Sequence, residues 1–194
     1  MVADQLKRLA AAALTIIIFF GGSSTATFSE GLGLALDSAG NRSIKILADT
    51  DYFPALLELL DHSASSVDLA MFVFKVGKGK SNRPAMIRDA LIKAAGRGVK
   101  VRVFLERSGH DDRLNDTNLK VASQLTAGGV KVIFESPKTT THNKMVVIDR
   151  RHAFIGSHNF TQSALKYNHE MSLLIDNREL AEKLVSYMEN SIQP

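Results

Sequence analysis

The chain contains no cysteine among its 194 residues, and aromatic residues make up only 7% of it. Without cysteine, neither a disulfide framework nor a cysteine-ligated metal site can form. A domain of this length does not need disulfides to fold, so their absence decides nothing about the compartment. The scarcity of aromatic residues beside basic ones also argues against a surface that binds nucleic acid by base stacking, because Phe72 and Phe74 are expected in the core.

The N-terminal segment lacks an apolar run long enough to cross a bilayer, which takes about twenty residues. Residues 9–20 are almost wholly apolar, follow Lys7 and Arg8, and precede a stretch of small residues that ends at Ala26. This order is typical of a secretory signal peptide over residues 1–26. We therefore expect export to the periplasm or the medium. An uncleaved membrane anchor and a buried helix are the alternatives.

Strong charge of either sign is also missing. Lys and Arg number 24 against 20 Asp and Glu, which gives a net charge of +4. The attraction to polyanions is mild and does not identify a partner. With 45% hydrophobic residues the chain can bury one core, so disordered and repetitive classes are excluded. Residues 27–42, rich in Gly, Ser and Ala, are expected to be a linker to one domain over residues 43–194.

Short β-branched runs alternate with amphipathic segments from residue 43 onward. The predicted strands are residues 44–47, 67–74, 99–105, 130–134, 145–148, 152–155 and 171–175. The predicted helices are residues 54–62, 84–95, 118–127 and 180–190. This alternation indicates a layered α/β domain with helices on both faces of the sheet.

The most informative stretch has the form His-x-Lys-x-x-x-x-Asp, from His142 through Lys144 to Asp149. Gly156, Ser157 and Asn159 follow close behind as Gly-Ser-x-Asn. Histidine can attack phosphorus or protonate a leaving oxygen, and lysine supplies a positive charge. Serine and asparagine supply uncharged hydrogen bonds to phosphate oxygens. The combination predicts a site that cleaves phosphodiesters.

Side chains alternate along a strand, so His142 and Lys144 should project to the same face. Asp149 falls at an odd offset and at the exit of the strand, so we expect it to support the site from outside. Gly156 is expected to let the backbone approach a ligand closely.

A basic loop follows the predicted strand that ends at residue 74, and it contains Lys75, Lys78, Lys80 and Arg83. Two interpretations remain equally open: a solvated surface, or a clamp on nucleic-acid phosphates or anionic lipid headgroups. The loop would lie near the site if its strand runs parallel to the strand that follows His142. A P-loop is excluded because Phe74 stands where that motif needs glycine.

Two other kinds of site find no support. The histidines at positions 142, 152, 158 and 169 lack the spacing of a zinc site. Ser157 lacks the Gly-x-Ser-x-Gly pattern of a hydrolase nucleophile. We therefore expect no metal and no cofactor.

The two motifs together resemble the HKD motif of the phospholipase D superfamily. Asn168-His169-Glu170 is similar to a further feature of that family, and the resemblance covers residues 43–190. It implies a phospholipase D-like catalytic domain, a layered α/β/α sandwich with a mixed β-sheet. Only one HKD motif is present. This resembles the short bacterial endonucleases, in which a homodimer builds one active site across a two-fold axis.

The resemblance also implies a mechanism. His142 would attack phosphorus to form a phosphohistidine, and His142 of the partner subunit would protonate the leaving oxygen. Lys144, Ser157 and Asn159 would hold the phosphate oxygens, while Glu170 would hydrogen-bond His142. Asp149 belongs to the catalytic motif in a supporting role.

The substrate remains open. A nonspecific endonuclease on DNA or RNA is favoured. A phospholipase D that converts glycerophospholipids, with an anionic phospholipid as partner, is the alternative, and a noncatalytic phosphate-binding module is the third.

Overall fold

The structure is a computed structural model, and it describes residues 34–36, 43–79 and 81–194. The predicted signal peptide at residues 1–26 lies outside the described residues. The predicted linker at residues 27–42 contains a short strand, Leu34–Leu36, which pairs with the first strand of the predicted domain. At least part of this segment therefore belongs to the sheet.

The strands form one eight-stranded sheet in the order β1-β2-β8-β7-β6-β3-β4-β5. Their bounds are β1 Leu34–Leu36, β2 Ser43–Ala48, β3 Ser66–Met71, β4 Lys100–Leu105, β5 Lys131–Phe134, β6 Lys144–Ile148, β7 His152–Gly156 and β8 Met171–Asp176. The pairs β3–β4 and β4–β5 are parallel, and the other pairs are antiparallel. The sheet is therefore mixed, as predicted.

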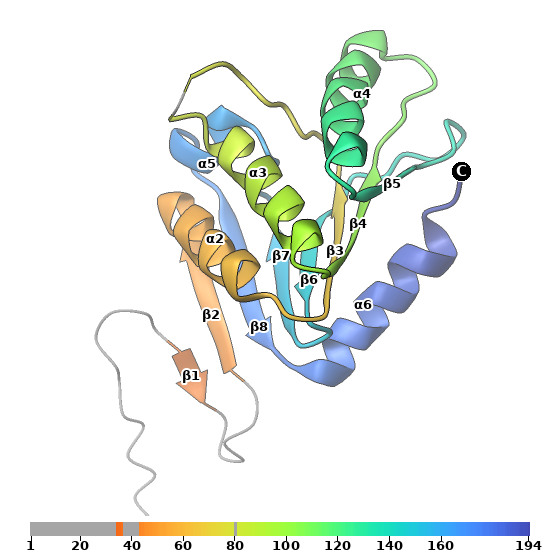
Figure 1. The fold of residues 1–194 in the computed structure, drawn as a ribbon. Helices are drawn as coiled ribbons and strands as arrows, with labels where there is room; N and C mark the ends of the chain where they lie inside the picture. The colour runs from red at the N-terminus through yellow and green to blue at the C-terminus, as the bar shows by residue number, and fades with distance from the viewer. Residues whose placement is uncertain (1–33, 37–42, 80) are drawn as a thin grey trace, which may run out of the picture.

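Helices cover both faces of the sheet (Figure 1). One face carries α2 (Tyr52–His62), α3 (Arg83–Gly96), α4 (Asp112–Ala127) and the short α5 (Gln162–Lys166), and the other carries α6 (Arg178–Ser191). The predicted α/β/α layering is confirmed. No helix within the described ranges is long and apolar enough to cross a membrane.

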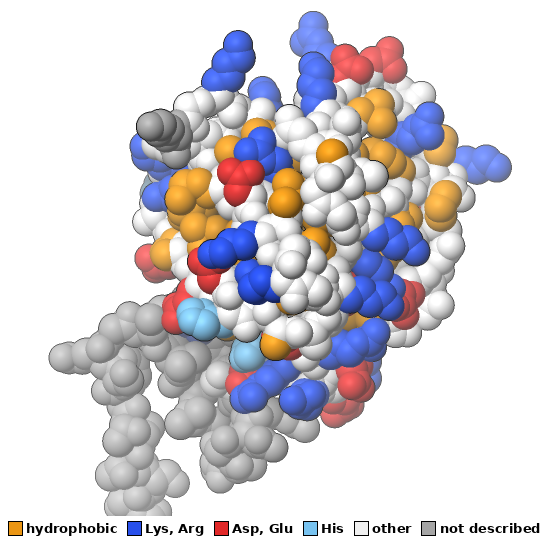
Figure 2. Space-filling model, viewed as in Figure 1, with side chains coloured by type: hydrophobic (Ala, Val, Ile, Leu, Met, Phe, Trp, Pro, Cys, Tyr) orange, Lys and Arg blue, Asp and Glu red, His pale blue; other side chains and the backbone are white. Residues whose placement is uncertain are grey.

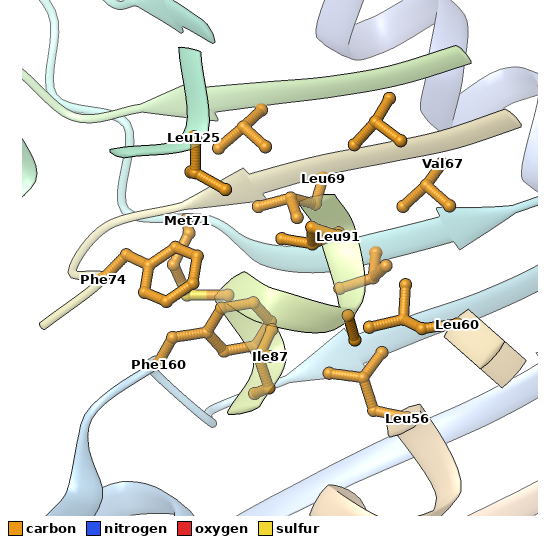
Figure 3. Packing of buried hydrophobic residues seen from close by; sticks show 14 of the residues in the cluster. Leu56, Leu60, Val67, Leu69, Met71, Phe74, Ile87, Leu91, Leu125 and Phe160 are labelled. Atoms are coloured by element: carbon orange, nitrogen blue, oxygen red, sulfur yellow. The ribbon is translucent and has the colours of Figure 1, made fainter. Parts of the chain in front are cut away.

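The alternation of side chains along β3 builds a separate core on each face. Leu69 packs in the larger cluster with Leu60 of α2 and Leu91 of α3 (Figure 3). Ala70, the next residue, packs with Val185 on the α6 side. Every residue of β3 is buried, as expected of a central strand covered on both faces.

Helix starts were the least accurate part of the prediction. The helix expected at residues 118–127 begins at Asp112, where the Asp111 side chain accepts a hydrogen bond from the amide of Leu114 at 3.0 Å. The polar first turn looked like loop, although acidic residues suit a helix N-terminus. Helix α5 was missed because five residues are too few to show a period.

Candidate active site

The polar side chains of the motif gather at one edge of the sheet. His142 lies two residues before β6, Ser157 directly follows β7, and Glu170 directly precedes β8. These three strands are antiparallel neighbours, so the start of β6, the end of β7 and the start of β8 lie at the same edge. The topology thus brings together residues up to 28 positions apart in the sequence.

His142 and Lys144 are in direct contact. The Lys144 ammonium lies 3.0 Å from Nδ1 of the His142 ring and donates a hydrogen bond to the His142 carbonyl at 2.7 Å. An ammonium group can only donate, so Nδ1 is the acceptor and the proton of the neutral ring is on Nε2. The two residues share one face, as their spacing predicts.

Phe72, just after β3, forms the wall behind this pair. Its ring centroid lies 4.6 Å from that of His142, and the Lys144 ammonium lies 5.0 Å from the same ring. The Phe72 amide donates to the carbonyl of Asn143 at 3.0 Å. The expectation that Phe72 and Phe74 are both core is wrong for Phe72, which is half-buried at the site, and right for Phe74, which is fully buried.

The two motif side chains have altered acidity. Partial burial of the ring, and then the charge of Lys144, lower the pKa of His142 below its ordinary value, although the residue as a whole is exposed. Burial also lowers the pKa of Lys144, while the nearby Glu170 carboxylate opposes that shift. A lowered pKa keeps the imidazole neutral near pH 7, which is the form that can act as a nucleophile.

Glu170 is bonded to its own loop. One carboxylate oxygen accepts from the hydroxyl of Ser157, and the other accepts from Asn168 Nδ2 at 3.0 Å. The hydrogen bond expected between Glu170 and His142 does not occur in this chain, where Nδ1 of His142 contacts Lys144 instead. The Ser157 hydroxyl, assigned to phosphate binding, also accepts from the amide of Met171 at 3.0 Å. Both side chains therefore shape the loop that carries them.

Asp49, which directly follows β2, fixes that loop from the neighbouring strand. Its carboxylate accepts from the amide of Glu170 at 2.9 Å and lies 3.2 Å from Nδ1 of His169. Its own amide donates to the Glu170 carbonyl at 2.9 Å. The Glu170 amide, and then His169, lower the pKa of Asp49, so its carboxylate is charged at neutral pH.

His158 is a structural residue inside the second motif. It is fully buried and stacks on Tyr52 with ring centroids 4.4 Å apart. Its two nitrogens lie 2.7 Å from the Ser172 hydroxyl and 2.9 Å from the Asp49 carbonyl. A buried histidine with both nitrogens bonded holds β8 and the Asp49 turn together.

Gly156 and Asn159 frame the second motif. A Cβ at Gly156 would collide with Ser172 and with the Met171 carbonyl. The glycine is therefore needed for close packing on β8, and the expected approach of its backbone to a ligand stays a prediction. Asn159 is half-buried, and its Oδ1 has no hydrogen-bond partner among the described residues.

Asp149 lies at the far end of β6 from His142. Its carboxylate accepts from the amides of Ala64, Ser65 and Ser66 at 2.7–3.2 Å and from the Ser65 hydroxyl at 2.8 Å. Burial raises the pKa of Asp149, but these hydrogen bonds outweigh it and lower the pKa overall. Asp149 touches neither motif side chain and serves as a structural anchor, in keeping with a supporting role.

The basic loop does reach the active edge, but for a different reason from the one expected. Strand β3 is antiparallel to β6, and Met71 pairs with Lys144, so the end of β3 meets the start of β6. The amide of Lys75 donates to the Phe160 carbonyl at 2.8 Å, one residue beyond Asn159. The condition of parallel strands was wrong, while the placement of the loop was right.

The members of this loop are not equivalent. Lys75 and Lys78 are exposed, whereas Lys80 lies outside the described residues. Arg83 is half-buried, bonds the Leu165 carbonyl and lies 4.9 Å from the Phe53 ring, so it is a packing residue. Lys and Arg side chains are spread over the visible face, with acidic side chains among them (Figure 2).

The described residues contain no group of three or more His, Cys, Asp or Glu side chains arranged to hold a metal ion. Asp49 and Phe72 are the site residues that the sequence did not reveal. Both follow strands that end at the active edge, and a search for residues just beyond strand ends could have found them.

Residues 56–192 match the family described as cardiolipin synthase, PLD-like domain. A phospholipase D of Rickettsia felis is 39% identical over 106 residues, which are 55% of this chain and 49% of that protein. A polyphosphate kinase of Escherichia coli is 28% identical over 168 residues, which are 81% of this chain and 24% of the kinase. The chain thus spans at most about half the length of these curated relatives.

Two solved structures share the fold. Nuc from Salmonella typhimurium, a phospholipase D family member, has a TM-score of 0.65 at 22% identity, covering 77% of this chain and 93% of that one. NucT from Helicobacter pylori has a TM-score of 0.57 at 22% identity, covering 76% and 94%. The family match extends over most of the described chain and includes both motifs. The chain belongs to the phospholipase D superfamily.

Proposed function

We propose that this protein cleaves phosphodiester bonds through a phosphohistidine intermediate. The observation that carries the proposal is the direct contact of His142 and Lys144 at a sheet edge that also carries Glu170 and Asn159. An imidazole held neutral beside a fixed ammonium suits attack on an anionic phosphorus centre.

The first step uses the His142 ring as nucleophile. A phosphate oxygen that binds the Lys144 ammonium would replace its contact with Nδ1. The proton of the ring could then move to Nδ1 and free the lone pair of Nε2. As Nε2 bonds to phosphorus, the bond to the leaving oxygen breaks, and that oxygen needs a proton. Lys144 and Asn159 would stabilise the charge that builds on the nonbridging oxygens.

One subunit supplies only one such histidine, so we propose a homodimer. His142 of the partner subunit would enter the step as the protonated imidazolium, give that proton to the leaving oxygen and, now neutral, take a proton from the water that hydrolyses the phosphohistidine. An apolar surface on β2 and β8, which reaches the active edge at Met171, supports this assembly. Ile44, Ile46 and Met171 are 49%, 63% and 55% exposed, and β2 and β8 carry them beyond the part of the sheet that α6 covers.

The favoured substrate is nucleic acid, cleaved without sequence preference. Lys75 and Lys78 are exposed on a loop that is bonded to the residue after Asn159, so they could contact phosphates next to the one being cleaved. The resemblance of the single motif to the short bacterial endonucleases adds support by analogy, and the two solved structures that share the fold are named Nuc and NucT.

Phospholipase D activity is the second candidate, and a specific observation favours it. Tyr167, three residues before Glu170, is 69% exposed. An exposed aromatic side chain next to the site could contact the glycerolipid part of a phospholipid. The Rickettsia relatives are named phospholipase D, which points the same way.

The test is to incubate the purified protein with plasmid DNA, single-stranded RNA and phospholipid vesicles in EDTA, with His142→Ala as control. Loss of nucleic-acid cleavage in the mutant would establish a nuclease that needs no added metal. Release of headgroups alone would establish the phospholipase. Absence of cleavage of every substrate by the wild type, with and without divalent cations, would contradict the proposal and favour a phosphate-binding module.

We also propose that the protein is exported, with cleavage after Ala26. Mass spectrometry of the mature protein from its native cells tests this point. A product that begins at Thr27 is expected, whereas an intact N-terminus would favour a membrane anchor.

A further inference from the structure

Two buried carboxylates lie next to the site and are not part of either motif. Glu106 follows β4, Glu135 follows β5, and they are only 1% and 4% exposed. Neither forms an ion pair with any described residue. Burying a carboxylate without a cation costs stability unless hydrogen bonds compensate, so the bonds they make should reveal their purpose.

Both carboxylates bind the residue that precedes the nucleophile. The amide of Thr141 donates to Glu106 Oε2 at 2.6 Å, and the Thr141 hydroxyl donates to Glu135 Oε2 at 2.7 Å. Thr141 itself is 3% exposed, whereas its neighbour His142 is exposed. The backbone is therefore fixed on one side of His142 while the ring remains accessible.

Buried groups hold these carboxylates in place. Asn118 of α4, fully buried, donates to the carbonyls of Glu106 and Phe72 at 3.0 and 2.9 Å and accepts from the amide of Phe74 at 3.0 Å. Glu135 accepts from the amide of Ser136 at 2.9 Å. One polar network thus supports both the segment before His142 and the Phe72 wall behind it.

The pKa of Glu106 reflects its buried position beside Thr141 and Glu135. Burial raises its pKa, the Thr141 amide opposes that shift, and the charge of Glu135 adds to it. A glutamine of the same shape could still accept the bond from the Thr141 amide, so the network depends on an acceptor more than on a charge.

We propose that Glu106 and Glu135 are positioning residues, which clamp Thr141 and thereby hold the His142 imidazole in the orientation for attack. This inference rests on the proposed function. It adds to that function the two residues that align the nucleophile, although neither touches the substrate. A displacement of about 1 Å at a reacting group can cost on the order of 100-fold in rate, so the clamp should act on kcat.

The test compares Glu106→Ala, Glu106→Gln, Thr141→Val and Thr141→Ser on bis(p-nitrophenyl) phosphate, which needs neither a nucleic-acid nor a lipid site. Glu106→Ala and Thr141→Val should lower kcat by about 10- to 100-fold and leave KM within about twofold. Glu106→Gln and Thr141→Ser keep the respective bonds and should retain most of the activity. If Glu106→Ala does not fold, the Thr141 pair carries the comparison.

Asp68→Asn is the matched control. Asp68 is also a buried carboxylate, but it pairs with Arg102 in the middle of β3. Its substitution should lower the melting temperature without a change in kcat. Equal losses of kcat in Glu106→Ala and Asp68→Asn, or a kcat of Glu106→Ala within twofold of the wild type, would overturn the proposal.

Amide hydrogen exchange at Thr141 and His142 separates this inference from the proposed function. If the wild type cleaves no phosphodiester, the proposed function fails. The clamp is then judged by exchange alone, which should accelerate in Glu106→Ala and not in Asp68→Asn. Unchanged exchange in Glu106→Ala would overturn the clamp.

Discussion

The two ends of strand β6 carry residues of the same motif but are built in opposite ways. At its start, the charged Lys144 ammonium contacts the neutral imidazole of His142, and His142 is exposed. At its end, Asp149 is surrounded by three amides and a hydroxyl that satisfy its charge. The charge of Lys144 therefore remains available to a ligand, whereas the charge of Asp149 is fully engaged by its hydrogen-bond donors. A single sequence motif therefore combines the proposed reactive groups at one end with an anchor at the other.

The largest expected effect is at the start of the strand. His142→Ala should lower turnover by about 10⁴-fold or more, because it removes the group that forms the covalent bond. The ring is exposed, so the melting temperature should stay close to that of the wild type. Steady-state kinetics together with a thermal melt check both points. Substantial residual turnover in a folded mutant would remove His142 from the mechanism.

Lys144→Met should have the next largest effect. The substitution keeps an apolar chain against Phe72 but removes the charge that would stabilise the transition state, so turnover should fall by about 10²- to 10³-fold. Lys183→Met, on the exposed face of α6, is the matched control and should have no effect. Comparable losses in the two mutants would mean that only the overall charge matters.

Asp149→Asn should have the opposite effect: it should lower stability and leave turnover unchanged. Asparagine tolerates the positive φ of 52° at this position, but the substitution weakens the bonds to three amides. We expect a loss of about 1–3 kcal/mol in unfolding free energy with turnover of the folded enzyme unchanged. Denaturant titration and kinetics below the midpoint test this prediction. A fall in turnover at full folding would make Asp149 part of the chemistry.

The pH dependence of stability tests whether the charge of Asp149 stabilises the fold. Because the pKa of Asp149 is lowered in the folded state, its contribution to stability is present above the ordinary value of 3.8 and is lost as the pH falls through the folded pKa. The stability difference between wild type and Asp149→Asn should therefore shrink in acid. A difference that stays constant from pH 7 to pH 3 would rule out the charge as its source.

The smallest expected effect is a shift in the pKa of the His142 ring. Burial and the charge of Lys144 both lower the pKa of His142, and Lys144→Met removes only the second cause. The pKa should therefore rise in the mutant but remain below 6.5. An NMR titration of the ring measures it directly. A pKa that falls or does not move would show that Lys144 exerts no field on the imidazole.

The sequence predicted the strands and the contact of His142 with Lys144 because local patterns determine both. Runs such as residues 145–148 are apolar enough to identify a buried strand, and the spacing of His142 and Lys144 fixes their common face. The supporting residues could not be predicted in this way. Asp49 and Glu106 act on loops that are far away in the chain, and only the order of the strands brings them there.

The position of Phe72 also could not be predicted from the local sequence pattern. An aromatic residue at the end of an apolar run looks like core, and Phe74 indeed is. The strand ends at Met71, however, and the chain then turns so that Phe72 faces the site. One residue of error in the end of a strand is enough to exchange a core residue for a site residue.

The pairing of β2 with β8 determines when the loop that carries Glu170 can become ordered. Asp49 and Glu170 are 121 positions apart and meet only after the last strand has docked on β2. Contacts between segments so far apart form slowly, and this one requires synthesis to have passed β8. A nascent or truncated chain that lacks β8 could form β3, β4 and β5 and still have no ordered Glu170 loop. The proposed cleavage would therefore begin only after β8 has docked, and chains without β8 would be inactive.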